Sequence, residues 1–427
     1  MVTSLFENVL RYAKTSGLVT STMARHVAEN VLGATINHEK HSSHLTAALG
    51  NLKGPIMKMA QFLATVPGAL PDEYAKAFLS LQTNAPPMSS VFVNRRMQSE
   101  LGPNWQDSFD HFEMTPSFAA SLGQVHKASL RHPQSSFHDV ACKLQYPNME
   151  QVMDADLNQL KLILSLYEVF NDALKTDEIF QEVQEKLKEE LNYGQEAEYM
   201  ELYGRIFQDN SHIQIPKVIT ELSTSRLLTM EWVDGVSLMT LINEGQELRN
   251  TLGRHLFYGW YYPFYHHHVL HGDPHPGNYY GHRNGSITLL DFGCVRAFKT
   301  TFIQGVVDLY RSFQREDKEL RVHAYTSWGF QNLNHEMIEI ISDWAKLLME
   351  PLLDDRVRPI QEKITGWDVA SKVHQKLQKL GGIRPPREFV FMDRAAVGIG
   401  SVLFHLNAQQ NWHQLFEALI AHFPRSS

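Results

Sequence analysis

Cysteine is almost absent from this 427-residue sequence, and so is any excess of positive charge. The two cysteines, Cys142 and Cys294, are too few for a disulfide framework, which indicates a reducing compartment. Lys and Arg number 39 against 47 Asp and Glu, so the formal net charge is −8. Because non-specific nucleic-acid binding requires a basic surface, this charge argues against a nucleic acid as partner.

Long apolar runs are missing as well. The most apolar windows, 162–170 and 397–406, fall short of the roughly 18–20 residues that a membrane span needs, so we predict no transmembrane segment. We also expect no secretory signal, since no charged region followed by an apolar stretch opens the chain. A hydrophobic content of 43% nevertheless supports a sizeable core and excludes global disorder. At roughly 100–200 residues per domain, the length predicts two or three domains or one two-lobed enzyme.

The residue pattern changes twice along the chain. Apolar spacing predicts helices up to about residue 100, and short strands with helices between them from about 115 to 235. The predicted strands cover 121–130, 139–145, 213–218 and 226–233. Residues 150–209 are predicted to form two helices that are separated near 171–177. After residue 235 we expect mainly helices, apart from a compact segment at 269–293.

The strongest local signal is the run His-Gly-Asp-Pro-His-Pro-Gly-Asn at 271–278, followed by Leu-Leu-Asp-Phe-Gly at 289–293. Phosphoryl transfer requires one carboxylate to orient the acceptor, and a carboxamide with a second carboxylate to hold Mg²⁺. Asp273 and Asn278 are five residues apart, and Asp291 lies thirteen further on. This spacing matches the catalytic loop, hairpin and metal-binding aspartate of kinase-like folds. It predicts a catalytic Asp273, with Asn278 and Asp291 as magnesium ligands.

A nucleotide site is expected upstream of this motif. Lys143 lies on the predicted strand 139–145, and it follows an alanine-rich loop at 119–126 whose small side chains allow backbone N–H groups to approach phosphates. Glu190 and Glu196 are the two candidate acidic partners for its ammonium group. Residues 230–235 fit a linker between lobes, with backbone groups near the adenine. The predicted nucleotide contacts are Ala119, Ala120, Ser121, Gly123, Gln124, Lys143, Glu231 and Val233.

Three consecutive histidines, at 266–268, raise the alternative of a zinc site. Zinc is usually held by spaced ligands, and three neighbours on one helix cannot all face a single ion. We therefore favour structural or solvent-exposed roles for them. The two cysteines are interpreted as inert packing residues.

Taken together, these residues make the chain resemble the UbiB/AarF-domain family of atypical protein-kinase-like proteins, over nearly its whole length from about residue 52. The family's Lys-x-Gly-Gln helix corresponds to Lys58-Met-Ala-Gln61, and its Glu-x-Asp element to Glu190-Leu-Asn192. The alanine-rich loop that replaces a glycine-rich one is the third shared motif. The resemblance implies an α+β, helix-rich, two-lobed kinase-like fold with an N-terminal helical extension. The expected domains are the extension at 1–112, a small lobe at 113–233 and a helical large lobe at 234–427.

The resemblance also implies residue roles and an activity. Lys143 would bind the α and β phosphates of ATP and pair with Glu196. Lys58 and Gln61 would lie over the cleft and contact Glu190 and Asn192. In the family the helical extension covers the place where a protein kinase receives its peptide, which implies an ATP- and Mg²⁺-dependent ATPase or a small-molecule or lipid kinase.

The family supports ubiquinone (coenzyme Q) biosynthesis, which implies quinone precursors, an anionic lipid surface and ubiquinone-biosynthesis enzymes as partners. We expect a cytoplasmic protein, peripheral at a membrane, and a mitochondrial one in a eukaryote. Three departures from the family motifs matter. Ala60 replaces a glycine on a helix, where we expect little change, and Asn192 replaces an aspartate and removes a charge. Phe118 stands where the longer alanine run would begin, so the first position of the loop is expected to be packed instead of facing phosphate. Two other readings stay open, namely a nucleotide-gated scaffold without catalysis and a phosphotransferase of the aminoglycoside or choline kinase type.

Overall fold

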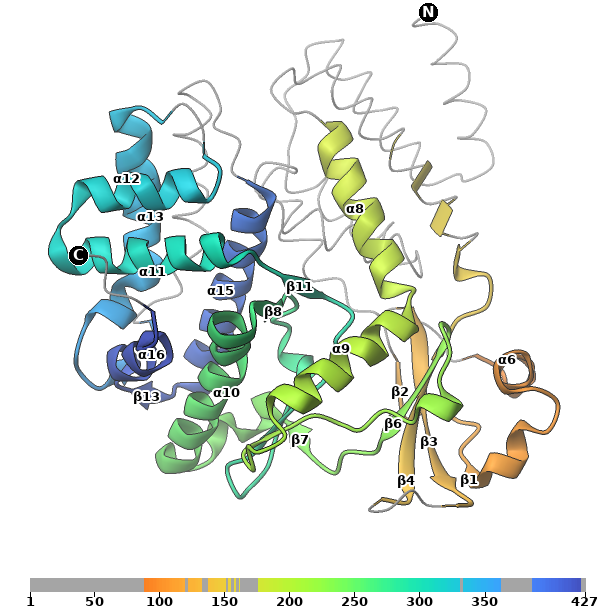
Figure 1. Ribbon diagram of the computed structural model, residues 1–427. Coiled ribbons are helices and arrows are strands. Elements are labelled where there is room, and N and C mark those ends of the chain that lie inside the picture. Colours follow the sequence, from red (N-terminus) through yellow and green to blue (C-terminus); the bar gives the residue numbers. More distant parts are fainter. Residues whose placement is uncertain are drawn as a thin grey trace, which may run out of the picture. The chain divides into compact units, whose positions relative to one another are not determined.

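The computed structural model describes residues 88–119, 122–132, 137–150, 176–330, 333–361 and 386–423, with short pieces at 153–154, 157–158 and 161 (Figure 1). The chain divides into two compact units. The described residues of the first unit fall within 88–99, 113–126 and 143–191, and those of the second unit fall within 100–112, 127–142 and 192–423. The predicted helices before residue 88 lie outside the described residues.

A five-stranded sheet runs in the order β1, β3, β4, β6, with β2 paired to β3. Its strands are β1 (Phe109–Phe112), β2 (Phe118–Ala119), β3 (Gly123–Leu130), β4 (Asp139–Gln145) and β6 (Leu227–Glu231). In the middle of β3, buried and half-buried residues alternate, as expected for a strand with one face toward the core. In β4 every residue after Asp139 is buried. The predicted strands at 121–130 and 139–145 are thus confirmed, and the strand predicted at 226–233 forms over the shorter range of β6.

The strand predicted at 213–218 is wrong in length. Only β5 (Ile213–Gln214) forms, and it pairs parallel to β10 (Ile287–Leu289). Pro216 has no backbone N–H with which to continue a ladder, so the strand stops before it. Val218 then makes an isolated bridge to Met230.

The helical region after residue 176 contains one more break than predicted. A single helix was expected to follow 171–177, whereas α8 (Thr176–Glu190) ends and α9 (Tyr193–Ile206) begins within three residues. The cause is Asn192, whose side chain accepts a hydrogen bond from Gln195 N at 3.3 Å and caps α9. Asparagine is among the residues preferred at this position because its oxygen satisfies an otherwise unpaired N–H group.

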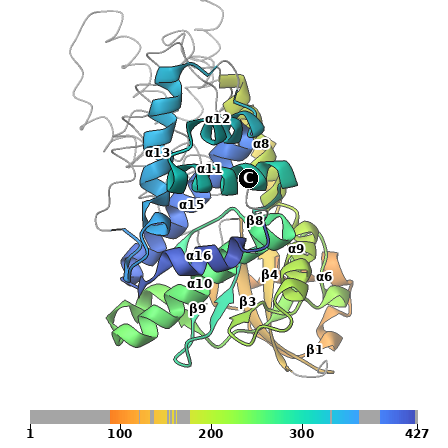
Figure 2. The same cartoon turned by 60° about the vertical axis from the view of Figure 1, so that its left-hand side comes forward.

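The second unit is mainly helical, as predicted for the chain after residue 235. Its helices include α10 (Gln246–His267), α11 (Thr300–Arg315), α12 (Lys318–Ser327), α13 (His335–Leu353), α15 (Arg387–Leu406) and α16 (Trp412–Ile420). Its further strands are β7 (Val236–Ser237), β8 (Val269–His271), β9 (Tyr279–Gly281), β11 (Val295–Ala297), β12 (Arg358–Pro359) and β13 (Gln409–Gln410). The short 3-10 helices of the described chain are Trp105–Ser108, Thr220–Leu222, Leu238–Asn243 and Pro276–Asn278. Both ribbon views show α10, α15 and α16 side by side (Figures 1 and 2).

The core of this unit is aromatic. Its largest fully buried side chains include Trp260, Trp412, Tyr310, Tyr325 and Phe257. The helix α15 is the one described helix that is long and apolar enough to cross a membrane by length and composition. Four of its buried residues belong to this core, namely Phe391, Ala395, Ile399 and Leu403. The buried helix of a hydrophobic core can have the same length and apolar composition as a membrane span.

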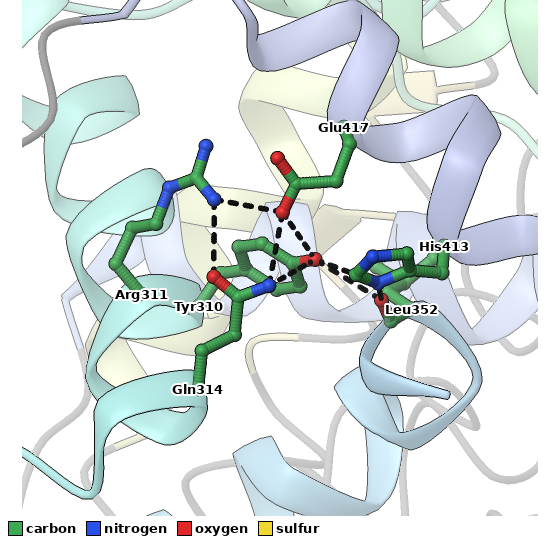
Figure 3. Close-up of polar contacts among 6 residues, drawn as sticks. All are labelled: Tyr310, Arg311, Gln314, Leu352, His413 and Glu417. Atoms are coloured by element: carbon green, nitrogen blue, oxygen red, sulfur yellow. Dashed lines mark hydrogen bonds and ion pairs between the residues drawn. The ribbon is translucent and has the colours of Figure 1, made fainter. Parts of the chain in front are cut away.

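A polar cluster joins three helices of the second unit: Tyr310 and Arg311 on α11, Leu352 on α13, and Glu417 on α16 (Figure 3). Tyr310 Oη donates to Oε1 of Glu417 at 2.8 Å, and Arg311 Nη1 donates to the same oxygen at 2.7 Å. Buried polar groups need such partners, so this cluster fixes how the three helices dock.

Candidate active site

A strand and a hairpin bring the predicted catalytic residues together in the second unit. Strand β8 ends at His271, directly before the loop that carries Asp273. The antiparallel pair β9–β10 sets Tyr279 opposite Leu289, and Leu290 N donates to Asn278 O at 2.9 Å. Asn278 and Asp291 therefore lie next to the same end of this hairpin, as their thirteen-residue spacing predicted.

Asn278 and Asp273 are joined directly. The Nδ2 group of Asn278 donates to Oδ2 of Asp273 at 3.0 Å and to its backbone oxygen at 3.2 Å. His275 N reaches Oδ1 of Asp273 at 3.3 Å. Because the amide nitrogen faces Asp273, the Oδ1 atom of Asn278 is turned away from it. A carboxylate and a carboxamide oxygen are thus held in fixed and different orientations.

His271 links the loop that carries Asp273 to Asp291. Its Nε2–H donates to the backbone oxygen of Asp291 at 2.8 Å, while Nδ1 accepts from Asp273 N at 3.4 Å. Burial lowers the pKa of this imidazole, which favours the neutral form that one donor and one acceptor require. His271 therefore connects Asp273 and Asp291 through two hydrogen bonds as a neutral ring.

Asp291 has a left-handed backbone conformation, with a φ of +55°. Aspartate tolerates this region better than most residues, because its short side chain bonds locally. Here its Oδ1 accepts from Gly293 N at 3.3 Å. The fully buried Phe292 ring lies 4.9 Å from that of Tyr203 on α9 and 5.3 Å from that of His271. These contacts fix Asp291 from both sides.

The helix α9 brings Glu196 to the same place. Glu196 is buried, and its Oε2 lies 3.9 Å from the point that a Cβ on Gly293 would occupy. The sequence offered Glu196 as one of two candidate acidic partners for Lys143, and the family resemblance implied Glu196. The structure places it beside the Asp-Phe-Gly tripeptide at 291–293.

The donor atoms fit magnesium. Mg²⁺ prefers hard oxygen ligands and usually takes only one or two protein groups, with water and phosphate oxygens completing its shell. Asn278 and Asp291 supply a carboxamide oxygen and a carboxylate of this kind. In the described part of the chain no three His, Cys, Asp or Glu side chains cluster as a metal site. His266 instead has its Nε2 3.1 Å from Leu419 O.

The predicted nucleotide residues of the first unit are only partly described. Lys143 is buried within β4, and Ala119 on β2 pairs with Gln124 on β3. Lys58, Gln61, Ala120 and Ser121 lie outside the described residues, and Glu190 is half-buried at the end of α8. The pairing of Lys143 with Glu196 would join the two units, and it stays a prediction.

Gln124 has a structural role that the sequence did not indicate. Its side chain is fully buried, with Oε1 accepting from Met88 N at 2.8 Å and Nε2 lying 2.7 Å from His126 Nε2. The second ring nitrogen of His126 lies 2.7 Å from Glu113 O. Burial lowers the pKa of His126, so the chain of hydrogen bonds runs through a neutral ring. The predicted phosphate contact at Gln124 therefore concerns its backbone.

The predicted adenine linker is anchored within the second unit. Glu231 N donates to Lys217 O at 2.8 Å, and Trp232 N donates to Asp139 O at 3.0 Å. The Lys127 ammonium lies 4.9 Å from the centre of the Trp232 ring and 3.0 Å from Asp139 Oδ2. The side chains of Glu231 and Val233, on either side of Trp232, are half-buried.

Two supports of the site escaped the sequence analysis. Tyr279 Oη donates to the backbone oxygen of Asp273 at 3.3 Å, and Trp260 Nε1 donates to Tyr279 Oη at 2.9 Å. Tyr279 directly follows Asn278, so its place was within reach of a local argument. Trp260 lies on α10, and no local pattern marks it.

A small antiparallel sheet, a mainly helical unit and this Asp–Asn–Asp constellation define a protein-kinase-like fold. The family model described as the ABC1 atypical kinase-like domain matches residues 80–324, more than half of the chain, so the chain belongs to this family. The resemblance to UbiB/AarF proteins that the motifs indicated is confirmed.

Individual relatives agree with this assignment. The chain is 26% identical to the mitochondrial atypical kinase COQ8 of Schizosaccharomyces pombe, over 92% of this chain and 64% of that protein. It is 31% identical to the chloroplastic protein ACTIVITY OF BC1 COMPLEX KINASE 8 of Arabidopsis thaliana, over 65% of this chain and 37% of that protein. The chain thus spans less than two thirds of the length of both relatives.

Among solved structures, Mycobacterium tuberculosis Rv3197 in complex with erythromycin matches with a TM-score of 0.64. The match covers 94% of this chain and 100% of that chain at 24% identity. At this identity the likeness supports the fold and nothing finer.

Proposed function

We propose that this protein binds Mg·ATP and transfers its terminal phosphoryl group to water or to a small or lipid-like acceptor. The hydrogen bond from Asn278 Nδ2 to Asp273 Oδ2 carries the proposal. It joins a carboxylate suited to orient the attacking oxygen to a carboxamide suited to hold a metal ion. A hydrogen-bond cluster that only stabilised the fold would not need the Asp273 carboxylate and the Asn278 carboxamide beside a third acidic residue, Asp291, in a left-handed conformation.

Each residue has a role in this proposal. Asp273 orients the acceptor, and Asn278 and Asp291 hold Mg²⁺, which supplies charge neutralisation at the phosphates. Lys143 binds the α and β phosphates and pairs with Glu196. Backbone groups at 119–124 approach the phosphates, and those of Glu231 and Val233 meet the adenine.

The motif helix of the extension completes the proposed site. Lys58 and Gln61 cover the cleft and contact Glu190 and Asn192, which excludes a peptide substrate. The capping role of Asn192 supports this arrangement only in part, because its side-chain oxygen already accepts from Gln195 N. An uncharged residue here makes a weaker clamp on Lys58 than an aspartate would.

The proposed process is ubiquinone biosynthesis, with quinone precursors, an anionic lipid surface and the biosynthetic enzymes as partners. The support is the similarity to a relative named mitochondrial atypical kinase COQ8. In a eukaryotic cell the proposal places the protein in the mitochondrion, and otherwise in the cytoplasm at a membrane surface.

The test is phosphate release from Mg·ATP, with and without anionic liposomes and a phenolic quinone precursor. Asp291→Asn keeps the size of the side chain and tolerates the left-handed backbone, so it removes charge with little strain. We expect release that rises with lipid and falls at least about 100-fold in the variant. Nucleotide binding without phosphate release under any condition would favour the non-catalytic scaffold. Phosphate transfer to an added alcohol would favour the small-molecule kinase.

A further inference from the structure

The helix α15 touches the catalytic loop at the two residues that flank Asp273. A Cβ atom on Gly272 would overlap the ring of Phe391, and a Cβ atom on Gly398 would overlap the ring of Pro274. Both α15 residues lie more than 100 positions beyond the loop in sequence. The loop is thus enclosed by a distant helix on both sides of its acidic residue.

The two glycines of α15 differ in what surrounds them. Among the described residues, a Cβ on Gly400 would come within 4 Å of only the side-chain nitrogen of Gln361, at 3.3 Å, whereas a Cβ on Gly398 would overlap two carbons of Pro274. Glycine within a helix is less favourable than alanine, so a glycine at such a position calls for a structural reason. At Gly398 the close approach of the Pro274 ring explains why a glycine is present. At Gly400 the described residues offer no contact of similar closeness.

Pro274 cannot easily move away from a larger neighbour. Its ring is fused to the backbone and fixes φ, so a displaced ring moves the peptide that joins it to Asp273. On the other side Phe391 is buried and held in place. The Arg296 guanidinium lies 4.9 Å from the centre of the Phe391 ring, and the Phe298 ring lies 6.0 Å away.

Further along, α15 is tied to α13. Trp344 Nε1 donates to Oδ1 of Asp393 at 2.7 Å. The packing of α15 in the helical core therefore sets its position. Through Gly398 and Phe391, α15 in turn sets the position of the loop that carries Asp273. A catalytic group must be held to within about 0.5 Å, so small displacements of this contact matter.

We propose that Gly398 and Phe391 are positioning residues, through which α15 fixes the place of Asp273 between Gly272 and Pro274. This inference rests on the proposed phosphoryl transfer at Asp273. The helix contacts the loop without supplying a group to the reaction, so its effect falls on turnover and spares nucleotide affinity.

The test compares Gly398→Ala with Gly400→Ala, two identical changes two residues apart on one helix. We expect Gly398→Ala to lower kcat about 10- to 100-fold and to change KM for ATP less than about 2-fold, because a misplacement near 1 Å can cost about 100-fold in rate. Gly400→Ala should stay within about 2-fold of the wild type in both constants. Equal kcat values in the two variants would overturn the inference.

Hydrogen exchange gives a readout that does not depend on turnover. In Gly398→Ala the amides of 271–278 should exchange at least about 10-fold faster than in Gly400→Ala, while those of α16 stay unchanged. Faster exchange throughout the unit would mean plain destabilisation and would refute a positioning role. If the wild type binds nucleotide but releases no phosphate, the proposed function fails, and the exchange at 271–278 still decides the inference.

A second pair covers the case in which Gly398→Ala does not fold. Phe391→Leu removes the ring beside Gly272. Phe389 lies on the same helix α15, and Phe389→Leu removes a ring whose centre lies 5.3 Å from that of Trp328. The same split between kcat and KM is expected for Phe391→Leu alone. Equal losses of kcat in both variants would contradict the inference.

Discussion

Asn278 donates one hydrogen bond to the carboxylate of Asp273 at 3.0 Å and another to its backbone oxygen at 3.2 Å. The two bonds hold the residue on both sides of its Cα, so neither the carboxylate nor the peptide can turn independently. Asn278 therefore orients Asp273.

Replacing Asn278 with aspartate tests this relationship. The change removes the donor and sets two carboxylates about 3 Å apart, where like charges oppose joint ionisation. We expect turnover at neutral pH to fall at least about 100-fold, and the loss in Tm to shrink as the pH is lowered and one carboxyl takes up a proton. Asn284→Asp is the control, because Asn284 Oδ1 only accepts hydrogen bonds from Ser286 and a carboxylate does the same. A Tm loss independent of pH would contradict the account.

Asn192 is predicted to matter for stability through its cap. Asn192→Ala should lower the free energy of unfolding by about 1 kcal/mol, the usual cost of losing such a cap. Asn192→Asp should stay within about 0.5 kcal/mol of the wild type, because a carboxylate also caps and suits the positive end of a helix. Chemical denaturation measures both. An aspartate variant as unstable as the alanine variant would show that the cap is not the cause.

The half-buried Asp393 should make stability depend on pH. Burial raises the pKa of its carboxyl from 3.8 to about 7, against the hydrogen bond from Trp344. A folded pKa above the unfolded one means that this contribution to stability is present below about pH 4 and is lost as the pH rises through about 7. Asp393→Asn removes this titration, so the variant should gain Tm relative to the wild type between pH 5 and 8. A constant difference across this range would count against the assignment.

Tyr310 should stabilise the second unit through its hydroxyl group (Figure 3). Besides donating to Glu417, the hydroxyl accepts from Gln314 Nε2 at 2.9 Å. Tyr310→Phe removes both bonds and leaves polar partners in a buried site, which costs about 1–3 kcal/mol of unfolding free energy. Tyr146→Phe is the control, since the buried hydroxyl of Tyr146 has no hydrogen-bond partner among the described residues. We expect a change within about 0.5 kcal/mol there, and equal losses in the two variants would refute the role of the cluster.

The central part of the site could be predicted because its geometry is local. Asp273, Asn278 and Asp291 lie within nineteen residues, and one short hairpin, with Tyr279 opposite Leu289, sets their distances. The motif spacing therefore already contained most of the three-dimensional arrangement. The strands β3, β4 and β6 were predictable for the same reason, since their apolar runs are short and clearly bounded.

The remaining features depend on partners that are distant in sequence. Nothing near Gly272 or Pro274 indicates that α15 packs on them, and Tyr310 meets Glu417 across more than 100 residues. The break at Asn192 was missed for a different reason. A capping asparagine within a long run of helix-forming residues gives only a weak signal, and periodicity passes over it.

The central claim is that Asn278 and Asp291 hold magnesium together with a nucleotide. The most direct measurement is the shift in Tm that ADP or ATP causes as Mg²⁺ is titrated, in the wild type and in Asp291→Asn. The account predicts nucleotide binding that depends on Mg²⁺ in the wild type, and a requirement for at least about 10-fold more Mg²⁺ in the variant. Nucleotide binding that is indifferent to Mg²⁺, or equal Mg²⁺ dependence in both proteins, would contradict it.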